Sequence, residues 1–215
     1  MRRIYFFAVW SFVIGLAVAV AAGRPHEKQQ GTPANSPAQA TTAAAQNPQP
    51  KPSPQIERLL HAFEGTWGTR EKFAPDAASP NGATAEGKIV WRPGPGGFSA
   101  VEEYQSRQGN TETTGMGVFW WDDAAHGYRT IWCDSTNPGG CISFKSVLRW
   151  EGLQLVLIED YEVNNKKLTF KEAFGNISSS TFTQTLYGGP RGGELKIDQT
   201  IQAAKLTNGA GSPRE

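Results

Sequence analysis

Between residues 65 and 204, apolar and polar side chains alternate along the chain, and clusters of Gly, Pro, Asn and Asp interrupt the alternation at short intervals. A period of two is typical of β-strands that bury one face, and such clusters are typical of the turns between strands. Because no helical pattern separates the strands, an antiparallel barrel is favoured over a parallel sheet. The sequence predicts ten strands, near residues 65–73, 84–92, 97–106, 113–121, 127–133, 141–150, 153–163, 166–174, 180–187 and 194–204.

A short helix is expected immediately before the first strand. Ser53 can cap its N-terminus and Pro54 suits its first position, while four apolar residues recur on one face. The predicted fold class is therefore all-β: a single antiparallel up-and-down β-barrel of about ten strands, preceded by a short N-terminal helix. The apolar helix residues are Ile56, Leu59, Leu60 and Phe63.

Two turns predict how the strands pair. If Glu151-Gly152 and Asn164-Asn165 are each the two-residue loop of a hairpin, both hairpins place the same side chains of the strand between them on one face. A shift of one residue would exchange the two faces, so this agreement supports the assignment. The predicted pairs are Trp150 with Leu153, Leu148 with Leu155, Phe144 with Glu159, Glu159 with Phe170, and Leu157 with Glu172.

The two cysteines fit the same arrangement. Pairing Cys133 with Cys141 across the loop of residues 134–140 puts Trp132 opposite Ile142 on the inward face already deduced. The cysteines then lie on the outward face. In an oxidising compartment the pattern predicts a cross-strand disulfide between them.

The face predicted to point into the barrel combines large apolar side chains with polar groups. A barrel packed solid should avoid inward polar groups, because an unpaired one costs ~1–3 kcal/mol, whereas a barrel that holds a ligand or water tolerates them. Bulges that turn some of these side chains outward, or a wet barrel mouth, are the alternative explanation. The inward apolar set is Ile89, Trp91, Phe98, Ala100, Tyr104, Tyr128, Trp132, Phe182, Leu186, Leu195, Ile197 and Ile201, and the polar set is Glu102, Ser146, Glu159, Glu172, Gln184 and Gln199.

Glu159 and Glu172 are predicted to be diagonal neighbours on adjacent strands. Two close carboxylates repel, so one keeps its proton to higher pH, and such pairs serve as general acid and base in enzymes. They are the candidates for catalytic residues, although no G-x-S-x-G, H-E-x-x-H, C-x-x-C or Walker motif accompanies them. The predicted ligand-binding wall consists of Trp91, Tyr128, Trp132, Phe144, Leu155, Leu157, Glu159, Phe170 and Glu172.

Charge and composition narrow the range of partners. A formal net charge of +1 is not the basic footprint of a nucleic-acid binder, so no nucleic-acid partner is expected. Three scattered histidines and two cysteines leave little material for a metal site, so neither a metal nor another cofactor is expected.

The first 22 residues have the form of a signal peptide. Arg2 and Arg3 precede an apolar run from Ile4 to Val20 that ends in small residues. The mature protein is therefore expected in the periplasm or outside the cell. An uncleaved inner-membrane anchor formed by residues 4–22 is the alternative, because the run approaches the roughly 17–20 residues that can span a bilayer. Contact with a membrane is expected only through such an anchor.

Residues 23–54 differ in composition from the rest of the chain. They include seven prolines and no aromatic residue, and most of the others are Ala, Gln, Thr and Asn. Such a segment cannot bury enough apolar surface to offset its ordering entropy, so it is predicted to be a disordered linker. The barrel is predicted over residues 55–206, with a flexible tail at 207–215.

Two stretches of the sequence resemble known families. The segment Phe63-Glu64-Gly65-Thr66-Trp67 resembles the G-x-W opening of the lipocalin and fatty-acid-binding superfamily, in which Trp plugs one end of the barrel. The run from Gly115 to Asp122, followed by Tyr128 and by Trp132 to Ser135, resembles the bacterial lipocalin-like family named domain of unknown function 1579. This likeness extends to about Leu206, and it implies an antiparallel lipocalin-like barrel without any assigned chemistry.

The chain also departs from related families. Its last predicted strand, residues 194–204, lacks the Arg that covers the Trp in lipocalins. No His lies in the last strands, where haem-binding nitrobindin barrels hold their iron ligand.

Three functions are compatible with these features. The sequence favours a binding module that holds a small amphiphilic or apolar molecule inside the barrel. An enzyme of hydrolase or isomerase type that uses interior carboxylates is the second hypothesis. The third is a structural or partner-binding envelope domain whose barrel is filled by its own side chains.

Overall fold

The computed structural model describes residues 50–77 and 79–207. The predicted signal or anchor, nearly all of the predicted linker and residues 208–215 lie outside the described residues. Within the described ranges one α-helix precedes eleven strands, and a short 3₁₀ helix separates the second strand from the third. The elements are α1 (Pro54–Phe63), β1 (Gly65–Phe73), β2 (Ala83–Pro93), η1 (Pro95–Gly97), β3 (Ser99–Gln108), β4 (Thr111–Asp122), β5 (Gly127–Asp134), β6 (Cys141–Ser143), β7 (Arg149–Glu151), β8 (Gln154–Val163), β9 (Lys166–Gly175), β10 (Thr181–Pro190) and β11 (Lys196–Lys205).

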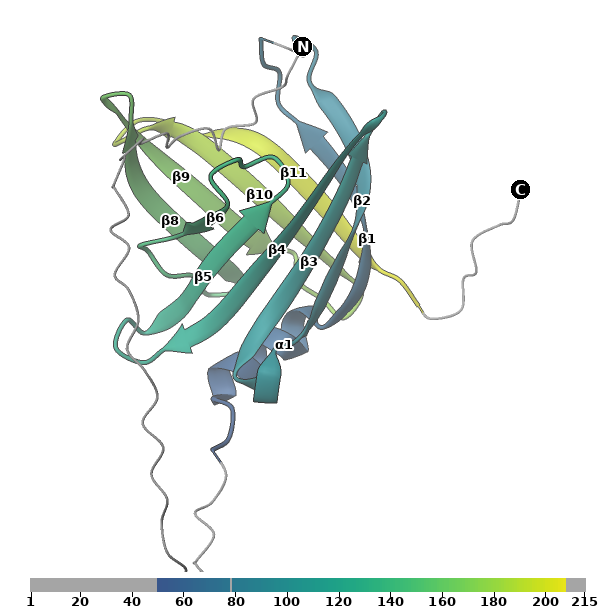
Figure 1. The fold of residues 1–215 in the computed structure, drawn as a ribbon, viewed down its shortest axis with the longest axis vertical. Helices are drawn as coiled ribbons and strands as arrows, with labels where there is room; N and C mark the ends of the chain where they lie inside the picture. Colours follow the sequence, from purple (N-terminus) through teal and green to yellow (C-terminus); the bar gives the residue numbers. More distant parts are fainter. Residues whose placement is uncertain (1–49, 78, 208–215) are drawn as a thin grey trace, which may run out of the picture. The chain divides into compact units, whose positions relative to one another are not determined.

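The strands form one antiparallel sheet that curls round on itself (Figure 1). The strand order is β6-β5-β4-β3-β2-β1-β11-β10-β9-β8-β7, so β1 and β11 lie side by side. The two outer edges of the sheet meet at one bridge, in which the N–H groups of Tyr128 and Leu148 donate to each other's carbonyl oxygens at 2.9 Å. The prediction of an all-β antiparallel fold with a short helix before it is confirmed.

The stretch predicted as one strand over residues 141–150 is divided in the structure. β6 pairs with β5, whereas β7 pairs with β8, so the chain changes partners between them. In between, the carboxylate of Glu159 accepts hydrogen bonds from the backbone N–H groups of Lys145 (3.3 Å) and Ser146 (2.7 Å). The prediction of a continuous strand was wrong because a segment that closes a barrel must leave one edge before it joins the other. Glu159 supplies acceptors for backbone donors that have left the ladder.

One of the two predicted hairpin loops is confirmed. Asn164 and Asn165 have φ angles of 50° and 60°, and they connect β8 to β9 with Val163 opposite Lys166. Two positive φ values are what a type I′ turn requires, and Asn tolerates them well.

The other hairpin loop is Gly152-Leu153 rather than Glu151-Gly152. Gly152 has a φ of 62°, as the first position of a type II′ turn demands. Trp150 therefore pairs with Leu155 instead of Leu153. Because this shift is two residues, the predicted division between inward and outward faces is kept.

Helix α1 closes one end of the barrel (Figure 1). Ser53 caps the helix by accepting a hydrogen bond from the N–H of Ile56 at 3.3 Å, and Pro54 occupies the first turn, as predicted. Phe63 at its C-terminal end is fully buried. The aromatic rings that pack against Phe63, with centroids 5.0–5.3 Å away, are those of Trp91, Phe174 and Phe182.

Trp67 fastens this helix to the sheet. Its Nε1–H donates to the carbonyl oxygen of Phe63 at 2.7 Å, and its side chain is fully buried. Lys205 lies with its Nζ 5.1 Å from the centre of the Trp67 ring and donates to the carbonyl oxygen of Glu64 at 2.8 Å. Lys205 thus covers the tryptophan from the end of β11. It lies one residue beyond the predicted last strand, residues 194–204, which has no arginine for this role.

The predicted disulfide is present. Cys133 and Cys141 are paired across β5 and β6, and Trp132 lies opposite Ile142. Within the described ranges, neither cysteine is free.

Two side chains predicted to point inward are exposed. Phe98 is 46% exposed because it caps the C-terminus of η1 and precedes β3. Ile197 is 50% exposed, since the register between β10 and β11 shifts after Leu186 and pairs Ile197 with the outward Tyr187. A bulge adds one residue to a strand and so exchanges its faces.

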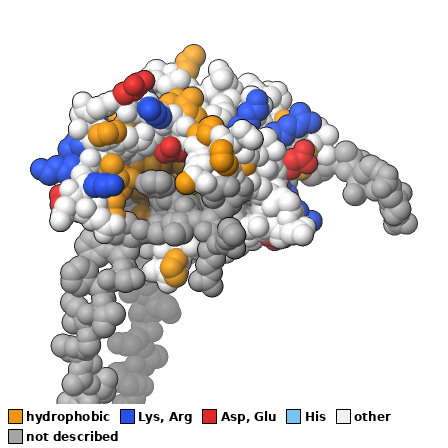
Figure 2. All heavy atoms as spheres, turned by 90° about the horizontal axis from the view of Figure 1, so that it is seen from above, with side chains coloured by type: hydrophobic (Ala, Val, Ile, Leu, Met, Phe, Trp, Pro, Cys, Tyr) orange, Lys and Arg blue, Asp and Glu red, His pale blue; other side chains and the backbone are white. Residues whose placement is uncertain are grey.

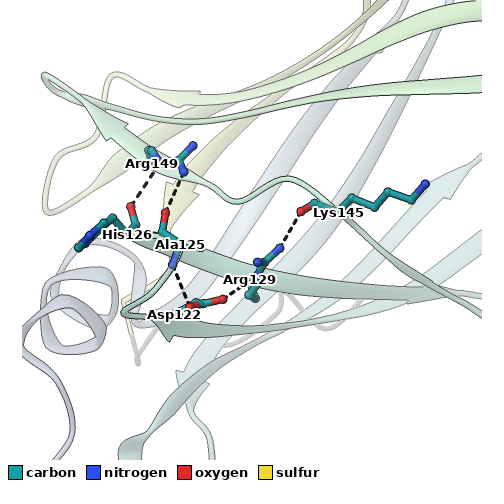
Figure 3. A network of polar contacts seen from close by, with 6 residues as sticks. All are labelled: Asp122, Ala125, His126, Arg129, Lys145 and Arg149. Carbon is teal, nitrogen blue, oxygen red and sulfur yellow. Dashed lines mark hydrogen bonds and ion pairs between the residues drawn. The ribbon is translucent and has the colours of Figure 1, made fainter.

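Two arginines hold the closing segment from outside (Figure 3). Arg149 donates to the carbonyl oxygens of Ala125 (2.8 Å) and His126 (3.3 Å) in the turn between β4 and β5. Arg129 on β5 donates to the carbonyl oxygen of Lys145 at 2.6 Å and pairs with Asp122 at 2.9 Å. Both guanidinium groups therefore connect β5 or its turn to the segment that joins β8.

We predict that Phe63→Ala lowers the free energy of unfolding by about 3–5 kcal/mol, because it leaves a cavity among three aromatic rings. Urea unfolding followed by circular dichroism measures the change. Leu153→Ala is the control, since Leu153 is 88% exposed and its loss should change stability by less than about 0.5 kcal/mol. Similar values for the two variants would contradict the role of the helix as a plug.

We also predict that replacing both Cys133 and Cys141 with Ser lowers the free energy of unfolding by about 2–3 kcal/mol, because the bridge restricts the unfolded chain. Urea unfolding of the oxidised wild type, the reduced wild type and the double variant tests this. The reduced wild type should match the variant, and three equal midpoints would contradict the prediction.

Candidate functional site

The half of the barrel away from α1 contains an open cavity of about 130 Å³. Figure 2 views the molecule from this side and shows hydrophobic side chains gathered there. At roughly 10–15 Å³ per water position, the volume admits about ten water-sized groups. The cavity is lined by Phe73, Glu102, Tyr104, Ser106, Gln108, Thr111, Thr113, Phe119, Thr130, Trp132, Asp134, Thr136, Phe144, Phe170, Glu172, Gln184, Leu186, Gln199 and Ile201.

The predicted ligand-binding wall is divided between this cavity and the packed core. Four of its members line the cavity: Trp132, Phe144, Phe170 and Glu172. Four others are fully buried in the core that surrounds the end of α1: Trp91, Tyr128, Leu155 and Leu157. The ninth, Glu159, binds backbone N–H groups at the barrel seam. Alternation along a strand reports which face a side chain occupies, but not how far it lies from the plug.

Two glycines on the inward face of β4 pack against aromatic rings that line the cavity. Gly117 lies between Glu102 and Trp132 on the neighbouring strands, and Gly115 lies between Tyr104 and Asp134. A Cβ atom at position 115 would lie 2.5 Å from the Trp132 ring, and one at position 117 would lie 2.8 Å from the Phe119 ring. Side chains larger than hydrogen at these positions would therefore displace the groups that line the cavity.

Glu102 is the most deeply buried acid of the cavity, with 2% of its surface exposed. In the described part of the chain, its carboxyl group has no hydrogen-bond partner. Burial, followed by the nearby charge of Glu172, raises the pKa of Glu102 well above its usual value. A buried polar group without a partner is costly, so the fold carries an energetic cost at Glu102.

Glu172 is the second acid that faces the cavity. Burial raises the pKa of Glu172 to about 7, although a hydrogen bond from Gln184 Nε2 to its Oε1 at 2.6 Å acts in the opposite direction. The amide oxygen of Gln184 is itself buried without a partner. The register makes Glu159 a diagonal neighbour of Glu172, as predicted, but the charge that couples to Glu172 is that of Glu102.

A third acid, Glu71, was not among the predicted inward residues. Its carboxylate accepts hydrogen bonds from Tyr104 (2.8 Å), Gln199 (2.9 Å) and Thr69 (3.3 Å), and it is 1% exposed. Burial raises the pKa of Glu71 and outweighs these bonds, which lower it. The alternation that starts at Trp67 could have located it, since residues 67, 69 and 71 share a face.

No arrangement of His, Cys, Asp and Glu suited to a metal ion occurs in residues 50–77 and 79–207. Across the same residues, no helix has the length and apolar character needed to cross a membrane.

The chain was compared with family models, curated proteins and solved structures. Neither a family model nor a curated protein matches the sequence. The crystal structure of Rv2717c from M. tuberculosis is similar, with a TM-score of 0.48 and 12% sequence identity over 73% of this chain and 100% of that chain. None of these comparisons tests the resemblance to the domain of unknown function 1579, which stays a prediction.

The buried acids predict how stability depends on pH. Below about pH 4 the folded and unfolded states both hold the proton of Glu172. As the pH rises, the unfolded chain releases it first, so the free energy of unfolding falls until the folded carboxyl also ionises near pH 7. The expected loss is on the order of 3 kcal/mol, and Glu102 acts in the same direction.

Glu172→Gln should therefore be more stable than the wild type at about pH 8 and equally stable at about pH 4. Glu159→Gln should have the opposite effect, losing about 1 kcal/mol, because an amide has one oxygen where Lys145 and Ser146 need two acceptors. Urea unfolding at both pH values measures these differences. Parallel pH profiles for the wild type and Glu172→Gln would place Glu172 in solvent.

Proposed function

We propose that this protein is an exported binding module that holds a small amphiphilic molecule in the cavity. The observation that supports this most is an open cavity with an aromatic wall and a few polar groups, next to a core that is packed tightly. Ligand sites in proteins commonly combine apolar walls with a small number of placed polar groups. Burial of an apolar ligand surface contributes roughly 25 cal/mol per Å².

The cavity also bears on the hypothesis of a barrel filled by its own side chains. The core around Phe63 is filled in that way, whereas the opposite half of the barrel contains the open cavity. An empty space beside buried acids has no benefit for stability. It is more consistent with a site that receives another molecule.

Export is supported by two features. The first 22 residues have the order of a signal peptide, with residues 4–22 as an anchor if the signal is retained. The bridge between Cys133 and Cys141 suits an oxidising compartment. A periplasmic or secreted barrel would meet small molecules that enter the cell envelope.

An enzyme on the same scaffold is the second candidate. Glu102 and Glu172 both have raised pKa values and face the same cavity, so either could hold a proton at neutral pH. General acids and bases need pKa values near the working pH. This pair replaces Glu159 and Glu172 as the carboxyls that could act on a bound molecule.

We predict that 2-phenylethanol, a neutral amphiphile of suitable size, binds saturably and that Leu186→Trp weakens it at least 10-fold. Leu186 lines the cavity, and the larger ring would occupy its volume. Ligand-observed NMR titration gives the dissociation constants. Ile197→Trp on the outward face is the control, since Ile197 is exposed. Equal affinity in both variants, or no saturable binding to the wild type, would overturn the proposed function.

A further inference from the structure

The charge-bearing side chains of the cavity are of one sign. Glu102 on β3, Asp134 on β5 and Glu172 on β9 line it, whereas no Lys, Arg or His is among its described lining residues. The remaining titratable group on the wall is the phenol of Tyr104, which donates to the buried carboxylate of Glu71 behind it. The cavity therefore offers negative charge and hydrogen-bond acceptors to whatever enters it.

Two side chains of the cavity wall have hydrogen-bond acceptors that no donor of the described residues contacts. Glu102 is 2% exposed and lines the cavity, and no hydrogen bond joins its carboxyl group to the other described residues. Oε1 of Gln184 is buried without a hydrogen-bond partner among the same residues. Glu172 is a third acceptor in this group. It lies next to Gln184, whose Nε2 donates a hydrogen bond to its Oε1. The three residues lie on β3, β9 and β10 and line one cavity.

The apolar wall consists mainly of aromatic rings. Phe144 and Phe170 are stacked with ring centroids 6.0 Å apart, and Tyr104 meets Trp132 edge to face at 5.9 Å. All four line the cavity. The faces of such rings attract cations as well as apolar groups, most strongly when water is excluded.

We propose that the polar end of the ligand is a protonated amine, received by Glu102, Glu172 and Gln184, with its hydrocarbon part against the aromatic wall. This inference rests on the proposed function and names the ligand class. An ammonium group has three N–H donors and no acceptor, so it matches the three acceptors. Its charge is opposite in sign to that of every ionisable acid on the cavity wall, and charge-assisted hydrogen bonds are the stronger ones.

Other polar ends fit less well. A carboxylate or phosphate would face Glu102 and Glu172 with like charge and would bring acceptors to a group of acceptors. A hydroxyl has one donor and no charge, so it would leave the other acceptors without partners. A bare metal ion would make no use of the aromatic rings and apolar volume.

Three probes with one phenyl ring separate these cases: 2-phenylethylamine, 2-phenylethanol and 2-phenylacetate. At about pH 8 the amine is protonated. We expect it to bind the wild type at least 10-fold more tightly than the alcohol, and the alcohol more tightly than the carboxylate. The preference for the amine should shrink as the pH falls to about 5, because Glu172, whose pKa is raised to about 7, then takes up a proton.

Substitutions test which residues set the preference. Glu102→Gln and Glu172→Gln should bring the amine to within about 3-fold of the alcohol. Circular dichroism and urea unfolding of each variant show that it folds. Glu103→Gln is the matched control: it removes the same charge from the next residue of β3, which points outward and pairs with Arg92. It should keep the full preference.

The outcomes separate this inference from the proposed function. If the alcohol binds the wild type and Leu186→Trp removes that binding, but the amine binds no more tightly, the inference is wrong and the proposed function stands. If the carboxylate binds best, or if Glu103→Gln lowers the preference as much as Glu102→Gln, the inference is also wrong. If none of the three probes binds, both are wrong.

Discussion

The packing of Phe63 against Trp91, Phe174 and Phe182 is the contact on which the rest of the barrel depends. A curled sheet has two open ends, and an inward apolar face gains nothing until at least one end is closed to water. Helix α1 closes one end with the buried side chains of Ile56, Leu59 and Phe63, and the hydrogen bond from Trp67 to the Phe63 carbonyl ties the end of the helix to the sheet. Because one half is packed so tightly, the other half can remain open and still belong to a stable domain.

The two halves of the barrel use the same strands for different purposes. On β2 and β5, Trp91 and Tyr128 lie in the core, while Trp132 on β5 lies in the cavity. On β4, the missing side chains of Gly115 and Gly117 leave space for the rings of Trp132 and Phe119, which line the cavity. These two glycines thus have a physical role, because they let aromatic rings of the cavity wall pack against β4.

Sequence reasoning predicted the faces of the strands but not positions along the barrel axis. Alternation and the Asn164-Asn165 turn set the pairing of β8 with β9, and the two cysteines set that of β5 with β6. The seam was missed, since the loss of ladder bonds near Lys145 is compensated by Glu159, a residue distant in sequence. The bulge that turns Ile197 outward and the coupling of Glu172 to Glu102 also arise from tertiary arrangement, which no local pattern encodes.

The buried acids connect the stability of the fold to its proposed ligand. Glu102 and Glu172 lose their hydration in the folded state, and at neutral pH the empty barrel bears the cost of that loss. A cation that enters the cavity offsets this cost. Its binding therefore raises the free energy of unfolding that the ionised acids had lowered. Replacing the acids with neutral side chains would stabilise the empty barrel and weaken its attraction for an amine. Functional sites commonly reduce the stability of the fold that carries them. Here the acids of the cavity lower stability, and the packed core beside them maintains the structure.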